Sequence, residues 1–209
     1  INRIAPGRCF IGLGTGHTAM RTLGHKPMRV APFREYVGVV RALLDGDEID
    51  YTLDGETHPI RFQMREHRFI DLEPRIDLYI AGNGPRLQAL AGEMADGLIT
   101  ALPRGGTIAG AMDNVRRGAA SSGRTLPASF HTSAMVNVAL LEPGEAANSE
   151  RVLSQWGAAA ITGLHYLVAQ HLEFGTEPPP YAQGIWDAYL AWLNEAPPEV
   201  RHQRLHNSH

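Results

Sequence analysis

The sequence predicts an α/β fold built around a parallel sheet, and two of its features carry that prediction. Short apolar runs alternate with amphipathic helices along most of the 209 residues. Two glycine-rich turns each follow an apolar run directly, as at the carboxyl end of a strand. Strands and helices that alternate in this way form parallel sheets with right-handed crossovers. We therefore expect either an open, doubly wound sheet or part of an eight-stranded barrel.

The first expected strand covers residues 9–14 and runs into the turn Gly12-Leu-Gly-Thr-Gly16. A polar loop over 17–26 follows, and Pro27 is expected to open a helix over 27–44. Apolar residues recur along one face of that helix, at Val30, Phe33, Val37, Val40 and Leu44. Arg29 lies in its first turn, where the helix dipole disfavours a cation. A bound anion would account for Arg29, and so would a solvated side chain.

An excursion is expected between that helix and the next strand. Residues 49–62 hold two short runs of strand character on either side of Asp54-Gly55. Asp-Gly is a favoured two-residue turn between antiparallel strands. The sequence therefore predicts a β-hairpin inserted outside the parallel sheet.

A second strand, turn and helix follow the hairpin. The strand covers 78–82, the turn is Gly82-Asn83-Gly84, and Pro85 opens a helix over 85–95. Free backbone N–H groups at a helix N-terminus, beside glycines that let a ligand come close, suit a phosphate. The alternative is an ordinary βα turn whose glycines serve only its geometry.

The remaining elements repeat the alternation. A strand is expected over 97–101, a helix over 107–121, a strand over 130–141, a helix over 145–173 and a short aromatic helix over 185–193. These strands are too few for a complete eight-stranded barrel, which needs ~250 residues. We therefore expect a partial (β/α)8 barrel, with about four of eight strands and the inserted hairpin. Residues 1–209 would form a single domain, an internal fragment of a longer chain.

The composition of the chain argues against several classes of function. The net charge of −3 does not suggest nucleic-acid or membrane-surface binding, and no apolar run approaches the ~20 residues that span a bilayer. The one cysteine, Cys9, favours a reducing compartment, the cytoplasm. The one lysine, Lys26, is poorly placed for Schiff-base or pyridoxal-phosphate chemistry. His202, His206 and His209 share a helical face but lack a matching carboxylate or cysteine, so no metal site is expected.

Three motifs together resemble one enzyme family. They are Gly12-Leu-Gly-Thr-Gly-His-Thr-Ala-Met-Arg, Phe33-Arg-Glu-Tyr-Val with Arg41-Ala-Leu-Leu-Asp-Gly, and Ile80-Ala-Gly-Asn-Gly-Pro-Arg with Leu90-Ala-Gly-Glu-Met-Ala-Asp-Gly. The motifs are similar to those of the luciferase-like oxidoreductases that depend on a flavin or on coenzyme F420, in the branch with methylenetetrahydromethanopterin reductase. The resemblance implies a TIM barrel that binds its cofactor at the carboxyl ends of the strands.

The resemblance also implies site residues. The contacts to the cofactor phosphate would come from Gly14, Thr15, Gly16, Arg29, Gly82, Asn83, Gly84, Pro85 and Arg86. The end of the chain resembles a histidine motif in which a histidine can face the substrate, which makes His209 the candidate catalytic residue. The two phosphate turns agree with the anion sites expected from the residues themselves.

The expected function is hydride transfer between coenzyme F420, a 5-deazaflavin, and a small organic substrate. One alternative is an FMN-dependent monooxygenase that uses O2 and reduced flavin from a separate flavin reductase. Another is a non-catalytic flavin-binding protein of the same fold. For each of these functions, a second copy of the chain is a candidate partner, in a homo-oligomer. A phosphate-sugar isomerase or lyase would need a base such as glutamate at a strand end, and the expected strand ends offer none.

Overall fold

The computed structural model describes residues 1–67, 69–101, 107–201 and 203–204, which fall into two compact units. The first unit comprises residues 1–17 and 27–135, and the second takes in 18–26 and the described residues from 136 onward. The expectation of a single domain within a longer chain stays a prediction. None of the helices in the described residues is both long and apolar enough to cross a membrane.

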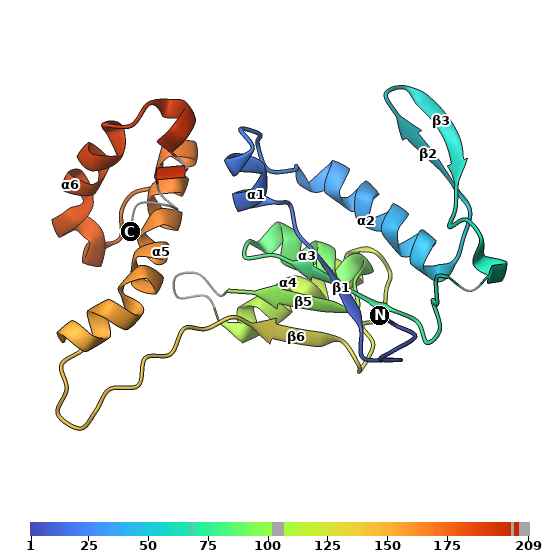
Figure 1. Ribbon diagram of the computed structural model, residues 1–209, viewed down its shortest axis with the longest axis horizontal. Helices are drawn as coiled ribbons and strands as arrows, with labels where there is room; N and C mark the ends of the chain where they lie inside the picture. The colour runs from blue at the N-terminus through green and yellow to red at the C-terminus, as the bar shows by residue number, and fades with distance from the viewer. Residues whose placement is uncertain (68, 102–106, 202, 205–209) are drawn as a thin grey trace. The chain divides into compact units, whose positions relative to one another are not determined.

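A four-stranded parallel sheet forms the centre of the first unit (Figure 1). Its strands are β1 (Phe10–Leu13), β4 (Asp77–Ala81), β5 (Gly97–Thr100) and β6 (His131–Ala134), in the spatial order β1-β4-β5-β6. Leu13 lies opposite Ile80, and Ile80 lies opposite Leu98. Within the described residues, β1 and β6 form the two edges, so the sheet is not closed into a barrel. The prediction of a parallel α/β sheet in sequential order is confirmed.

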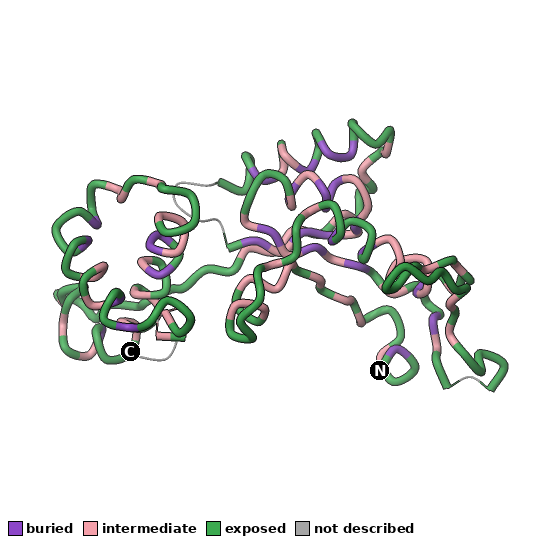
Figure 2. Tube along the Cα trace, turned by 90° about the horizontal axis from the view of Figure 1, so that it is seen from above, coloured by how far each residue is buried: buried purple, intermediate pink, exposed green. Residues whose placement is uncertain are grey.

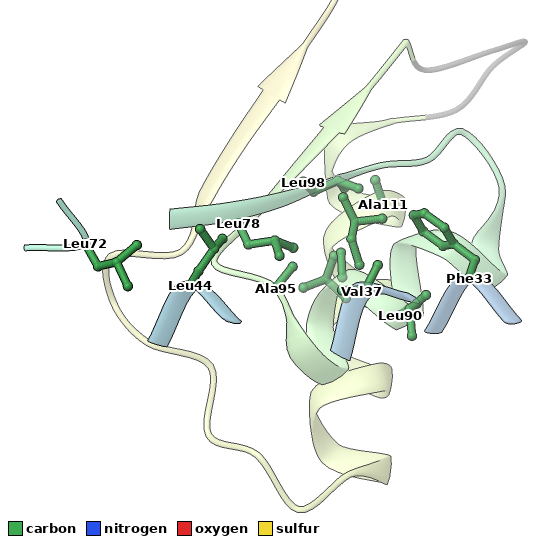
Figure 3. Packing of buried hydrophobic residues seen from close by; sticks show 12 residues of the cluster. Phe33, Val37, Leu44, Leu72, Leu78, Leu90, Ala95, Leu98 and Ala111 are labelled. Carbon is green, nitrogen blue, oxygen red and sulfur yellow. The ribbon is translucent and has the colours of Figure 1, made fainter. Parts of the chain in front are cut away.

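The core of the first unit lies between one face of this sheet and three helices, α2 (Val30–Asp45), α3 (Pro85–Met94) and α4 (Ile108–Ser121). Because successive strand residues point to opposite faces, Leu78, Ile80 and Leu98 turn to the same side. All three are fully buried, and they share one cluster with residues of the helices (Figure 3). The helical members of this cluster include Phe33, Val37, Leu90, Ala91, Ala111 and Val115.

Helices α3 and α4 approach each other at two buried glycines. A Cβ atom added at Gly92 of α3 would lie 1.9 Å from the carbonyl oxygen of Val115. A Cβ atom added at Gly118 of α4 would lie 1.9 Å from the carbonyl oxygen of Ala89. The two backbones are therefore in direct contact, and this contact sets the position of α3 and of the turn that precedes it.

The carboxylate of Asp96, at the amino end of the sheet, is surrounded by three arginines. Asp96 accepts a hydrogen bond from the backbone N–H of Leu78 at 2.9 Å. The guanidinium groups of Arg75, Arg41 and Arg124 lie 3.0, 3.5 and 3.9 Å from its oxygens. Asp96 thus ties β4 to α2 and to the chain that follows α4.

The hairpin lies outside the main sheet, as predicted. Strands β2 (Ile49–Leu53) and β3 (Glu56–Ile60) pair only with each other, antiparallel. Asp54 and Gly55 have φ angles of +53° and +85°, the left-handed conformation that a tight hairpin turn requires. Most residues of β2 and β3 are exposed (Figure 2). A 3₁₀ turn (Arg65–His67) follows the hairpin.

The second unit is helical. It contains α5 (Glu150–Phe174), α6 (Gln183–Asn194), most of α1 (His17–Thr22) and 3₁₀ turns at Pro180–Ala182 and Pro198–Val200. Leu167 and Val168 of α5 pack with Trp186 and Leu193 of α6. Arg21 of α1 forms an ion pair with Glu173 of α5.

Two expectations in the first half of the chain are corrected. Residues 17–26 were expected to be a loop, but they include α1. Helix α2 begins at Val30 rather than at Pro27. The backbone N–H of Met28 donates to the carbonyl oxygen of Thr15 at 3.0 Å, and Arg29 is extended, with φ −69° and ψ 157°. Residues 27–29 therefore run beside the turn after β1 instead of entering the helix.

Two expectations in the second half are also corrected. The strand expected over 130–141 ends at Ala134, because its last ladder bond runs from Met135 N–H to the carbonyl oxygen of Thr100, where β5 ends. The helix expected over 145–173 begins at Glu150. Its N-cap is Ser149, whose hydroxyl oxygen accepts the N–H of Val152 at 3.2 Å. A side-chain cap of this kind marks where a helix starts.

Candidate functional site

An open pocket of about 570 Å³ lies in the first unit, where the turn after β1 meets the starts of α2 and α3. Three of the described residues that line it are arginines, and none is acidic. The lining residues are Thr15, Met28, Arg29, Val30, Ala31, Arg34, Arg86 and Leu87. Its chemistry is that of a site for an anion.

The turn after β1 supplies one wall. Gly14 packs against β4, since a Cβ atom added there would make ordinary contact with Ala81 at 3.5 Å. Gly16 has a φ of +75°, a conformation that side chains rarely adopt. Between them, Thr15 lines the pocket and accepts the backbone N–H of Met28. That bond fastens this turn to the segment leading into α2.

The start of α2 supplies a second wall. Its N-cap is Arg29, and no side chain among the described residues caps the helix. The first N–H groups of an α-helix have no partner within the helix, and Val30 and Ala31, which carry two of them, line the pocket. The first turn holds no acidic residue. This helix end therefore offers positive potential and hydrogen-bond donors to the pocket.

The start of α3 supplies the third wall. Its N-cap is Gly84 and its first residue is Pro85, again with no side-chain cap in the described residues. A Cβ atom added at Gly84 would meet nothing within 4 Å, so a ligand atom can come close to this backbone. Gly82 has a different reason for being glycine, because a Cβ atom there would lie 2.4 Å from Cβ of Leu87.

Asn83 holds this turn against the sheet. Its Oδ1 atom accepts the backbone N–H of Ala101 at 2.8 Å and the hydroxyl of Thr100 at 3.4 Å. Its carbonyl oxygen accepts the side-chain amide of Gln88 at 3.3 Å. The side-chain oxygen of Asn83 is thus engaged with the end of β5, and Asn83 does not line the pocket.

The three arginines of the pocket differ in their partners. Arg34 of α2 makes a two-pronged ion pair with Glu93 of α3, with N–O distances of 2.5 and 3.2 Å. Arg29 and Arg86 are exposed. Within the described part of the chain, neither of these two makes an ion pair or a side-chain hydrogen bond. Two full positive charges therefore face the pocket without a counter-ion among the described residues.

The structure brings the two predicted turns together at one pocket. Thr15, Arg29 and Arg86 line it. The other predicted residues, Gly14, Gly16, Gly82, Asn83, Gly84 and Pro85, build the turns around it. His209 lies outside the described residues. The assignment of these residues to a cofactor phosphate stays a prediction.

Sequence reasoning missed Arg34. With the helix expected from Pro27, Arg34 would lie two turns in, far from any N-terminal site. With α2 beginning at Val30, it lies one turn in and reaches the pocket. No local sequence signal marks residues 27–29 as lying outside the helix. Among the described residues, no group of three histidine, cysteine or acidic side chains could hold a metal ion.

Comparison with known protein families aligns residues 1–205 with the model of the luciferase-like monooxygenase family. The chain belongs to this family. The family resemblance and the fold class expected from the three sequence motifs are thereby confirmed.

Named relatives add detail. The chain is 35% identical over 129 residues to an F420-dependent glucose-6-phosphate dehydrogenase of Mycolicibacterium fortuitum, covering 57% of this chain and 37% of the relative. It is 28% identical over 158 residues to the 5,10-methylenetetrahydromethanopterin reductase of Archaeoglobus fulgidus, covering 73% and 45%. A solved F420-dependent secondary alcohol dehydrogenase, in complex with an F420-acetone adduct, shares 25% identity and a TM-score of 0.49 over 64% of this chain and 41% of that one. The chain spans less than half the length of these proteins.

Proposed function

We propose that the protein is an oxidoreductase that transfers a hydride between coenzyme F420 and a small organic substrate, and that the pocket binds the cofactor phosphate. The observation that carries the proposal is a pocket lined by three arginines and no acid, at the uncapped starts of two helices. The names of two relatives support F420 as the cofactor. One is an F420-dependent dehydrogenase. The other is a methylenetetrahydromethanopterin reductase, the enzyme of the family branch that the sequence motifs resemble.

The residues present fit a phosphate. An arginine guanidinium group can bind a phosphate through two parallel N–H···O hydrogen bonds. Arg29 and Arg86 have no competing carboxylate among the described residues. Helix N-termini donate N–H groups to anions, and the open space at Gly84 lets an anion approach them. F420, when bound, supplies the deazaflavin ring that gives or accepts the hydride.

The role of these residues is to hold and orient. Charge-assisted hydrogen bonds contribute about 1.5–3 kcal/mol each, so a few of them at the phosphate hold a cofactor firmly without touching its reactive ring. In barrels of parallel strands, the active site lies at the carboxyl ends of the strands. The pocket is at that end of β1 and β4, because both turns that build it follow those strands.

A second candidate is an FMN-dependent monooxygenase, which the description of the matching family favours. FMN also ends in a phosphate, so the same residues would hold it. The two candidates differ in their chemistry with oxygen. The full-length protein is therefore to be titrated with F420 and with FMN, and oxygen uptake measured with each reduced cofactor. Tight FMN binding with oxygen uptake would replace F420 in the proposal. Binding of either cofactor without turnover of any substrate would indicate a non-catalytic flavin-binding protein.

The pocket itself is tested by Gly84→Asp in the full-length protein. Aspartate is a better N-cap than glycine by a few tenths of a kcal/mol, so the fold should keep or gain stability. Its carboxylate would take the N–H groups that the phosphate needs and would repel the phosphate. We expect F420 affinity, followed by quenching of F420 fluorescence, to fall at least about a hundred-fold.

The matched control is Gly84→Asn, which has nearly the same shape and caps the helix without charge. It should lose clearly less affinity than Gly84→Asp while melting at a similar temperature. Arg86→Ala should lower the affinity about ten- to a hundred-fold. Wild-type affinity in both Gly84→Asp and Arg86→Ala would remove the phosphate from this pocket.

A further inference from the structure

We propose that Arg34 binds a second anionic group of the cofactor, a carboxylate that lies beyond its phosphate, as in the glutamate tail of F420. The inference rests on the proposed function and deepens it. It concerns the residue of the pocket that sequence reasoning did not find.

The position of Arg34 sets it apart from the other two arginines. Arg29 is the N-cap of α2, and Arg34 follows one turn into the helix. A helix rises about 1.5 Å per residue, so the cationic lining continues along α2 after its first N–H groups end. A phosphate held by the helix ends is bound by Arg29 and Arg86. Arg34 then faces whatever the ligand carries next.

The charge balance also calls for a second anion. The phosphate of F420 links two parts of the cofactor and carries one negative charge. Arg29 and Arg86, together with two uncapped helix ends, already exceed that charge. A cation near a helix N-terminus is unfavourable by itself, and Arg29 lies there, next to a first turn of α2 that holds no acidic residue. A ligand with a further carboxylate balances this excess.

The ion pair with Glu93 leaves Arg34 able to bind. Its two-pronged contact uses one N–H of each terminal nitrogen. The guanidinium group keeps further N–H donors in the same plane. The side chain of Arg34 is 54% exposed, whereas that of Glu93 is 14% exposed. Glu93 thus holds the guanidinium from the buried side, and its open side remains available to a ligand.

The test compares two ligands on the full-length protein. One is F420 with its glutamate tail, and the other is the same deazaflavin truncated directly after the phosphate. Arg34→Gln should weaken binding of tailed F420 about ten-fold or more, because one charge-assisted contact is lost. The truncated ligand should bind Arg34→Gln and the wild type with the same affinity.

Two control variants separate ligand contact from structure. Glu93→Gln breaks the charge pairing between α2 and α3 but keeps the guanidinium, so it should bind tailed F420 as tightly as the wild type or more tightly. Arg116→Gln removes an exposed arginine of α4 that pairs with Asp113 outside the pocket, and should change nothing.

The outcomes divide clearly. Equal losses for both ligands in Arg34→Gln, no loss for either, or the same loss in Glu93→Gln would each overturn this inference and leave the proposed function standing. A wild-type protein that binds neither ligand would overturn the proposed function itself.

Discussion

Replacing Gly92 by alanine tests the contact between α3 and α4, on which the pocket depends. The new Cβ atom would lie 1.9 Å from the carbonyl oxygen of Val115, 2.7 Å from its carbonyl carbon and 2.9 Å from the backbone nitrogen of Ala119. All three atoms belong to the backbone, so no side chain can rotate to make room. The helices would have to separate by roughly 1.5 Å to restore ordinary contact.

The expected cost follows from two opposed terms. Overpacking a core costs about 1–3 kcal/mol, occasionally more, and a clash with backbone belongs at the upper end of that range. The substitution also stabilises the helix by up to about 1 kcal/mol, because alanine is a better helix former than glycine. We expect Gly92→Ala to lower the free energy of unfolding by about 2 kcal/mol, measured by urea denaturation of the full-length protein. F420 affinity should fall as well, because α3 carries Gly84 and Arg86 with it.

The same substitution at Gly38 of α2 is the matched control. A Cβ atom there would lie 3.7 Å from the terminal methyl carbon of Met94, an ordinary contact. Gly38→Ala should therefore stabilise the protein by about 0.4–1 kcal/mol. If Gly92→Ala were as stable as Gly38→Ala, the helices could not be packed backbone to backbone, and the reasoning would be refuted.

Two further predictions concern charge. Asp96→Asn should lower the free energy of unfolding by about 1–3 kcal/mol, because Leu78 keeps an acceptor while Arg41, Arg75 and Arg124 each lose one charged partner. Arg41 and Arg75 keep their contacts with Asp45, so the upper end of this range is not expected. Asp113→Asn, at an exposed pair, should cost under about 0.5 kcal/mol, and equal costs would contradict this account. The pKa of Glu145 is lowered to about 2 by the hydrogen bond from Arg151, with smaller contributions from a backbone N–H and a serine hydroxyl. A lowered pKa means that the ionised carboxylate stabilises the fold above about pH 4.5 and that this is lost as pH falls through about 2. NMR titration of the carboxyl group should give that midpoint, and Arg151→Gln should raise it; an unchanged midpoint would show that Arg151 is not the cause.

The elements that could be predicted from the sequence are those marked by residues within or next to the element itself. Pro85 after two glycines marks the start of α3, and Asp54-Gly55 marks the hairpin turn. The order of the parallel strands could also be predicted. In the sequence, one helix separates β4 from β5 and another separates β5 from β6, and a short crossover of this kind usually leads to the neighbouring strand. These features need no knowledge of distant residues.

Other features depend on what lies across the chain in space. Val136, Val138 and Leu140 alternate as strand residues do, yet they are exposed, because β5 ends before they could pair with it. Gly92 and Gly118 look like ordinary helix-weakening residues until the facing backbone is known. For the same reason, Arg34 could be assigned to the pocket only after the start of α2 was seen.

The insertion of the hairpin between β1 and β4 has a consequence for the order of folding. Strands β4, β5 and β6 are joined by single helices, so their pairings are comparatively local. Phe10 of β1 must instead find Asp77 across a long intervening segment, and closing a longer loop costs more chain entropy and slows folding. We expect β1 to join the sheet late. Since Thr15 follows β1 and Arg86 follows β4, the two halves of the anion pocket meet only at that last step, and a bound phosphate would favour its completion.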